Sequence, residues 1–253
     1  MVPLILPLVL LVAQSGAVAV ALLRGLWRST PAWTVYVCVA TVHLIVGLAL
    51  VPIIGSDYPL ALVYLEPLIL IGQIAFAFES CLKYLQVPLR GGSPESRLLL
   101  WLIPLVPTAL ILPVEIGFVQ DALASWHSQE RDALALLYAL RRLLSITLLV
   151  ILAVVPFIAK ARKIEPQATI RFHHFVLSGY LLCSVVGFFG KQYLSNKLDL
   201  VFTIAFFLAG PTICFAVWAG RMWKARPEDL RVQEPQPEAG DAHYQRHGIP
   251  QHP

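Results

Sequence analysis

Long apolar runs dominate the chain, and short polar or basic stretches separate them. Each run is about 20 residues long, the length of helix that crosses the hydrocarbon core of a bilayer. The pattern therefore predicts an all-α fold, a polytopic membrane helical bundle of seven transmembrane helices. The predicted spans are residues 3–23, 32–54, 59–82, 98–118, 134–159, 172–190 and 199–220.

The span at 59–82 differs from the others because polar side chains interrupt its apolar run. Glu66, Gln73 and Ser80 follow one another at intervals of seven residues, so they share one face of a helix. A carboxylate that faces lipid is costly, and this face should point to protein or to a water-filled cavity. We therefore expect the bundle to close around this helix, with the least lipid contact of all the spans and with Gln73 in the interior.

Charged side chains from neighbouring spans are predicted to lie at the depth of Glu66. Counting about 1.5 Å per residue from the basic edge of each helix places Glu115 and Arg141 in the same layer, just inside the outer boundary. The pattern predicts an outward-facing polar pocket in which Glu66 pairs with Arg141 or Arg142. The alternative is that Glu115 and the two arginines only extend to the outer headgroups.

Further polar residues complete the set of candidates. Tyr138 and Ser145 share the helix face of Arg141. His43, near the middle of its span, is either a ligand or proton carrier or a neutral histidine that hydrogen bonds between helices. The ligand-binding candidates are thus Glu66, Gln73, Arg141, Tyr138, Ser145 and His43, and the candidate catalytic acids are Glu66 and Asp199.

Two polar pairs near the basic edges are not expected to be part of the ligand site. Glu79 and Lys83 are separated by four residues and should form an ion pair on one helix. His173 and His174 lie beside Arg171 at the start of a span, where we expect them to contact headgroups.

Composition supports the membrane assignment and sets an orientation. The chain is 58% hydrophobic and 13% charged, whereas soluble domains are about 25% charged. One set of loops holds Arg24, Arg28, Lys83, Arg90, Arg97, Lys160, Arg162, Lys163, Arg171, Arg221, Lys224 and Arg226, and the other set holds only Arg131, Arg141, Arg142, Lys191 and Lys197. Because cytoplasmic loops are enriched in Lys and Arg, the protein is predicted to be a multi-pass cell-membrane protein with an external N-terminus and a cytoplasmic C-terminus.

The net charge of +4 follows from this loop bias, so no nucleic-acid partner is expected. Residues 1–224 are predicted to form the bundle, and the polar, proline-rich residues 225–253 to form a disordered cytoplasmic tail. The first apolar run has no basic residues before it, and we expect it to be a retained span rather than a signal peptide.

No metal site or cofactor is expected from the residue pattern. The four cysteines (Cys38, Cys81, Cys183 and Cys214) lie in or at the ends of apolar spans and form no CxxC pair. The histidines lack the spacing that would indicate haem, zinc or a di-iron centre.

Several seven-helix families can be compared with these motifs. Residues 198–220 read LDLVFTIAFFLAGPTICFAVWAG and contain no lysine, so the retinal linkage of microbial rhodopsins is not expected, and the end motifs of G-protein-coupled receptors are missing. In size, span number and possession of a membrane acid the chain resembles the fungal membrane-bound terpene cyclases, which implies Glu66 or Asp199 as the protonating acid. Residues 11–37, LVAQSGAVAVALLRGLWRSTPAWTVYV, resemble an uncharacterised group of bacterial seven-span integral membrane proteins.

These features leave three classes of function open. The first is ligand sensing or binding in the outer pocket, with a signal passed to a cytoplasmic partner. The second is an accessory subunit of a membrane complex or a small transporter. The third is a membrane enzyme that acts on a lipid or isoprenoid with Glu66 as general acid. The expected partners are the lipid bilayer, a small hydrophobic or lipid ligand and other membrane subunits.

Overall fold

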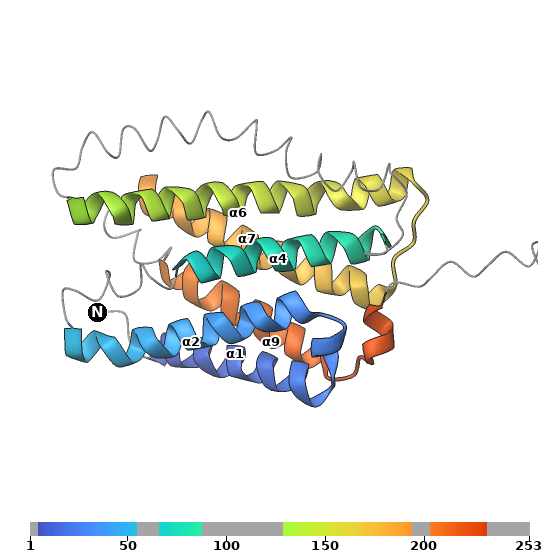
Figure 1. Ribbon diagram of the computed structural model, residues 1–253, viewed down its shortest axis with the longest axis horizontal. Helices are drawn as coiled ribbons and strands as arrows, with labels where there is room; N and C mark the ends of the chain where they lie inside the picture. Colours follow the sequence, from blue (N-terminus) through green and yellow to red (C-terminus); the bar gives the residue numbers. More distant parts are fainter. Residues whose placement is uncertain (1–4, 55–65, 88–128, 194–202, 232–253) are drawn as a thin grey trace, which may run out of the picture.

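The computed structural model describes residues 5–54, 66–87, 129–193 and 203–231, and the regular structure in these ranges is helical (Figure 1). The α-helices are α1 (Ile5–Leu23), α2 (Pro31–Ile54), α4 (Glu66–Tyr84), α6 (Gln129–Ala161), α7 (Ala168–Tyr193) and α9 (Gly210–Met222). The described ranges also contain two 3-10 turns, η1 (Leu26–Arg28) and η4 (Pro227–Leu230), and a π-helix, η3 (Thr203–Ala209).

Six helical segments in the described ranges are long and apolar enough to cross a membrane. The all-α class and the multi-pass membrane character predicted from the sequence therefore hold. The predicted span at 98–118 lies outside the described residues, so the seven-span bundle stays a prediction.

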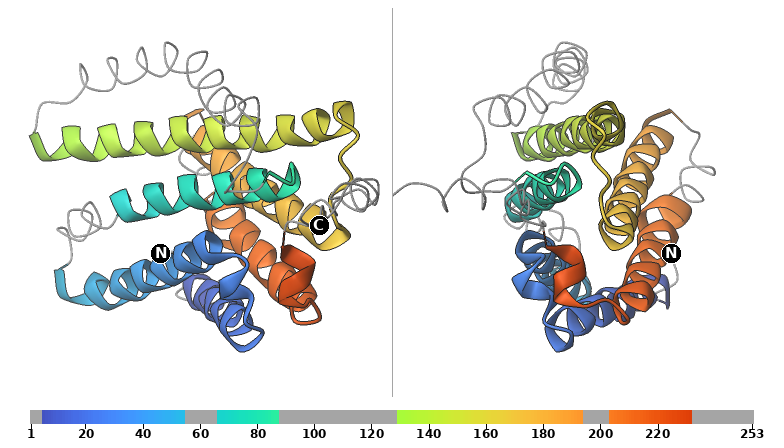
Figure 2. Two further views of the ribbon diagram at one scale, coloured as in Figure 1. Left: turned by 45° about the vertical axis from the view of Figure 1, so that its right-hand side comes forward. Right: turned by 90° about the vertical axis from the view of Figure 1, so that its right-hand side faces the viewer.

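The helices pack in a ring that follows chain order (Figure 2). α1 packs on α2, α2 on α4, α4 on α6, α6 on α7, and α7 on α9, and α9 returns to α1. A further contact between α4 and α7 crosses the ring. Residues that are far apart in the sequence thus face one another around a shared interior.

Within the described ranges, α7 rather than α4 is the most buried span. Of the residues in each span, 56% are buried in α7 and 44% in α4. This differs from the prediction that the helix at 59–82, which contains α4, has the least lipid contact. The reason is that α7 packs against α6 and α4 as well as against η3, α9 and η4. The polar face of α4 does point to the interior as predicted, since Gln73 is 0% and Ser80 1% exposed, whereas Ile71 is 63% exposed.

Helix α6 is longer than a bilayer requires. Its 33 residues correspond to about 50 Å at 1.5 Å per residue, whereas the hydrocarbon core is about 30 Å thick. The helix runs unbroken through Pro156. The helix is therefore longer than a perpendicular crossing of the core needs.

The last span changes its helix type at Gly210 and Pro211. Pro211 lacks a backbone N–H and cannot continue the usual hydrogen-bond pattern, and the seven residues before Gly210 form the π-helix η3. Gly210 also allows α9 to lie close to α7, because a Cβ atom there would be only 2.6 Å from Sγ of Cys183.

One end of the bundle, the basic end, gathers the ends of α1, α4, α6 and α9 and the starts of α2 and α7 (Figure 1). Turn η4 packs here against α7 and η1, and Leu230 is fully buried. Nη2 of Arg24 donates a hydrogen bond of 3.4 Å to the carbonyl of Ala225. The segment predicted as a tail, 225–253, thus begins with a packed turn, and its residues 232–253 lie outside the described ranges.

Candidate functional site

A cavity of about 120 Å³ lies inside the ring of helices. We call it the central cavity. At about 30 Å³ for each water, its share of liquid volume, the cavity has room for about four water molecules. The residues that line it are Leu10, Gln14, Tyr36, Ala40, His43, Leu44, Ile69, Arg141, Tyr180, Ser184, Phe207 and Pro211.

Helical periodicity explains why these side chains converge. On α2, Tyr36, Ala40 and His43 fall at intervals of four and three residues, which places them on one face. Tyr180 and Ser184 are four residues apart on α7 and share a face in the same way. His43 and Tyr180 each lie twelve residues from the basic-end start of their helices, or about 18 Å into the bundle. The cavity is therefore deep in the membrane-spanning part.

The cavity wall is joined across the bundle by two tyrosines. The hydroxyl groups of Tyr36 on α2 and Tyr180 on α7 hydrogen bond to each other in the interior. Gln73 and Arg141 lie within electrostatic reach of the Tyr36 hydroxyl. Four helices, α2, α4, α6 and α7, thus place polar groups around one point.

An aromatic cluster closes the cavity toward the basic end. Trp33 packs against Tyr36 and edge-on against Phe76, with ring centroids 5.9 and 5.5 Å apart. It also stacks on Phe215 at 5.7 Å, and Trp33 is 1% exposed. This packing fills the side of Tyr36 that faces the basic end with buried aromatic rings.

Two buried carboxamides in the bundle, Gln14 and Gln73, carry polar atoms with few hydrogen-bond partners, although Gln73 lies beside the Tyr36 hydroxyl. Oε1 of Gln14, and both Oε1 and Nε2 of Gln73, have no hydrogen-bond partner among the described residues. Gln14 is 6% and Gln73 0% exposed. Leaving a buried polar group unpaired costs about 1–3 kcal/mol. Such groups indicate that a water or ligand completes the site.

The sequence-based candidates divide into those at the cavity and those outside the described residues. His43 and Arg141 line the cavity, and Gln73 and Ser145 are fully buried. Oγ of Ser145 has no hydrogen-bond partner among the described residues. The side chains of Glu66 and Tyr138, and the whole of Asp199 and Glu115, lie outside the described residues. The predicted pairing of Glu66 with Arg141 or Arg142 therefore stays a prediction.

Four polar lining residues were not predicted as site residues: Gln14, Tyr36, Tyr180 and Ser184. Gln14 carried a usable signal, because a carboxamide inside an otherwise apolar span is costly unless it faces the bundle interior. The tyrosines carried none, since tyrosine is common at membrane interfaces and in helix packing.

The neighbouring histidines belong to the interior and not to the headgroup region. His173 is 1% and His174 3% exposed, so the expectation of headgroup contact was wrong. Nε1 of Trp218 donates to Nδ1 of His173 at 2.8 Å. His174 lies between Ser80 Oγ at 2.9 Å and the Leu152 carbonyl at 2.8 Å. In the neutral ring Nε2–H donates to that carbonyl, which leaves Nδ1 to accept from Ser80. These bonds fix α4, α6, α7 and α9 together.

Glu79 and Lys83 form the predicted ion pair, at 2.6 Å, and also hold the start of α2. Oε2 of Glu79 accepts hydrogen bonds from the backbone N–H groups of Ala32 at 2.7 Å and Trp33 at 3.1 Å. Nζ of Lys83 also donates to the Ser29 carbonyl. A carboxylate at a helix N-terminus satisfies N–H groups that have no partner inside the helix. This network fixes the position of Trp33 and, with it, the aromatic cluster.

Within the described ranges no group of histidine, cysteine and carboxylate side chains is arranged to hold a metal ion. The central cavity offers amides, hydroxyls, an imidazole and a guanidinium. Such a set can hydrogen bond a small polar molecule, in the manner of ligand pockets that combine an apolar wall with a few directed polar groups.

Comparison with known proteins finds no matching family model, no matching curated protein and no matching solved structure. The resemblance of residues 11–37 to bacterial seven-span proteins therefore stays a prediction from those residues.

Proposed function

We propose that this protein is a receptor-like membrane protein that binds a small polar ligand in the central cavity and passes a signal to a cytoplasmic partner. The observation that supports binding most strongly is Oε1 of Gln14, which is buried at the central cavity and has no hydrogen-bond partner among the described residues. A ligand that donates a hydrogen bond would satisfy this oxygen, which has no partner within the described ranges.

The described polar groups of the cavity suit binding of a ligand by hydrogen bonds. The enzyme alternative depends on Glu66 or Asp199 as general acid, and neither side chain is among those described. The cavity wall instead joins several helices through the Tyr36–Tyr180 hydrogen bond. A ligand that contacts these hydroxyls would change how α2 and α7 are held, which is the kind of differential contact that a signalling transition requires.

The route of the signal in this proposal begins at Tyr36. Its ring packs against Trp33, and the backbone N–H of Trp33 donates to Glu79 at the basic end. If the basic end is cytoplasmic, as the Lys and Arg distribution predicts, a shift of α2 would reach the face where a partner can dock. An accessory-subunit or transport function lacks an equivalent supporting contact among the described residues.

Native mass spectrometry of the gently extracted, full-length protein tests the binding step. Ala40 lines the cavity, so leucine in its place would project into the ligand space, whereas Ala49→Leu on the same helix changes an exposed residue. Wild-type protein and Ala49→Leu should retain a small-molecule adduct that Ala40→Leu loses. The same adduct on all three proteins, or none on the wild type, would contradict the proposal.

A further inference from the structure

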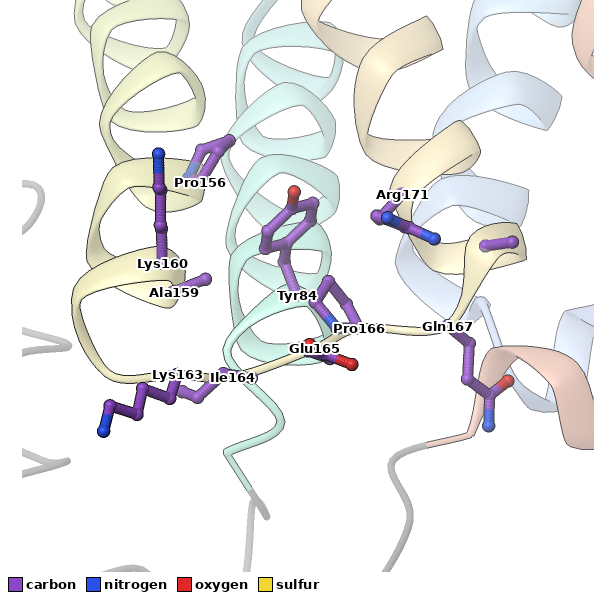
Figure 3. Close-up of a pocket in the computed structure, with 11 residues that line it drawn as sticks. Tyr84, Pro156, Ala159, Lys160, Lys163, Ile164, Glu165, Pro166, Gln167 and Arg171 are labelled. Atoms are coloured by element: carbon purple, nitrogen blue, oxygen red, sulfur yellow. The ribbon is translucent and has the colours of Figure 1, made fainter.

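A second cavity, separate from the central one, opens at the basic end. It has a volume of about 740 Å³ and lies where α4 ends, α6 ends and α7 begins. We call it the basic cleft (Figure 3). Its lining residues are Tyr84, Pro156, Ala159, Lys160, Lys163, Ile164, Glu165, Pro166, Gln167, Ala168 and Arg171.

The cleft has an excess of positive charge. Lys160, Lys163 and Arg171 line it, and Glu165 is the one carboxylate in its lining. None of these three cations forms an ion pair within the described parts of the chain, whereas nearby Lys83 is paired with Glu79. In Figure 3, Lys160 on α6 and Arg171 on α7 stand on opposite sides of Tyr84. Two cations therefore flank the space from different helices.

The start of α7 adds to this charge. Gln167 and Ala168, at the N-terminal end of the helix, line the cleft. The first turn of α7 contains no acidic residue that would neutralise its N-terminus. The N-terminus of a helix has partial positive charge and unpaired N–H groups, both of which favour phosphate-like anions.

The wall of the cleft is held by specific backbone contacts. At the end of α6 the N–H of Ile164 donates to the Ala159 carbonyl at 2.9 Å, and that of Lys163 donates to the Lys160 carbonyl at 3.1 Å. This is a Schellman-type cap, and Lys163 takes its left-handed position with φ of 57°. Nε2 of Gln86 donates to the Glu165 carbonyl at 3.1 Å, which ties the α6–α7 connection to the end of α4.

The surroundings of the cleft suit a lipid rather than a soluble anion. Pro156, Ala159 and Ile164 give its wall an apolar part. Phe175 is 75% exposed and lies four residues after Arg171, on the same face of α7. A headgroup phosphate between the cations would thus leave its acyl chain beside an exposed aromatic ring on the membrane-facing part of the helix.

We propose that the basic cleft binds the phosphate-containing headgroup of an anionic membrane phospholipid, with Lys160 and Arg171 as the main phosphate contacts. Basic pockets between transmembrane helices on the cytoplasmic side are suited to such headgroups. The site would hold a resident lipid at the basic end, independently of what the central cavity binds.

The test uses full-length protein in nanodiscs that contain equal amounts of phosphatidylglycerol and phosphatidylcholine, followed by native mass spectrometry of the released protein. The wild type should retain phosphatidylglycerol preferentially. The double variant Lys160→Gln/Arg171→Gln should lose this preference by roughly ten- to thirtyfold, given the usual contribution of basic residues to anionic-lipid attraction. The matched control Arg162→Gln/Lys224→Gln removes the same charge from exposed residues outside the cleft lining and should keep the preference.

Three results would overturn the proposal. The first is equal retention of both lipids by the wild type. The second is an equal loss of preference in the control, because the attraction would then belong to the whole basic end. The third is binding of inorganic phosphate that depends on Lys160 and Arg171 and does not compete with phosphatidylglycerol, because the cleft would then serve a soluble phosphate compound.

Discussion

The hydroxyl of Tyr36 on α2 is hydrogen bonded to the hydroxyl of Tyr180 on α7, 144 residues further along the chain. Both side chains line the central cavity and both pack into the aromatic cluster that closes it. Tyr36 is 1% exposed and Tyr180 7% exposed, so neither hydroxyl has bulk water as an alternative partner. The bond therefore couples the geometry of the cavity to the packing of two helices.

Tyr180→Phe should destabilise the protein because it leaves the Tyr36 hydroxyl buried without this partner. The expected loss in free energy of unfolding is about 1–3 kcal/mol. The double variant Tyr36→Phe/Tyr180→Phe should lose less than the sum of the two single variants, since no orphaned hydroxyl remains. Thermal unfolding in detergent measures all three, and strictly additive losses would show that the hydroxyls do not interact.

Gly72→Ala should destabilise the α2–α4 interface. A Cβ atom at Gly72 would lie 2.9 Å from Cδ2 of Tyr36, which must then move. Overpacking of this kind costs about 1–3 kcal/mol. Gly220→Ala is the matched control, because nothing lies within 4 Å of a Cβ atom there. Its unfolding temperature should stay the same or rise, since alanine favours helix. A similar loss in both variants would contradict the close contact.

Glu79→Gln should weaken the start of α2 and leave Lys83 without its carboxylate partner. Removing one member of a fully buried ion pair costs roughly 3–5 kcal/mol. Because the Glu79 side chain is 13% exposed, a smaller loss of about 2 kcal/mol is expected. Glu228→Gln changes an exposed carboxylate on η4 and should leave the unfolding free energy unchanged. Equal stability of Glu79→Gln and wild type would show that the network contributes little.

The basic end should face the cytoplasm. Arg24, Arg28, Lys83, Lys160 and Arg221 all lie at or near the helix termini that meet there. Cytoplasmic ends of membrane bundles are enriched in such residues. A reporter that is active only in the cytoplasm should be active when fused after Pro253 and silent when fused before Met1. The reverse pattern would invert the orientation.

The sequence was sufficient for features that depend on one helix at a time. Length and hydropathy located the six spans within the described ranges, and the seven-residue spacing placed Gln73 and Ser80 on the interior face of α4. The i, i+4 spacing likewise predicted the ion pair of Glu79 with Lys83. In each case the relevant neighbours are set by the helical repeat itself.

Features that depend on which helices meet could not be predicted in this way. Nothing in the chain links Tyr36 with Tyr180, or the Glu79 carboxylate with the first N–H groups of α2, because the order of helices around the ring is a tertiary property. His173 and His174 were assigned to headgroups from their place near a basic edge. Their hydrogen-bond partners Trp218 and Ser80 lie on other helices, and these bonds hold both histidines in the interior of the bundle.

The most direct test of ligand binding in the central cavity is a cryo-electron microscopy map of the gently extracted wild-type protein at a resolution that distinguishes waters. The account predicts continuous non-protein density in the cavity, larger than a single water and within hydrogen-bond distance of the Gln14 carboxamide. A cavity that contains only separate waters, or one closed by inward movement of the surrounding side chains, would contradict it.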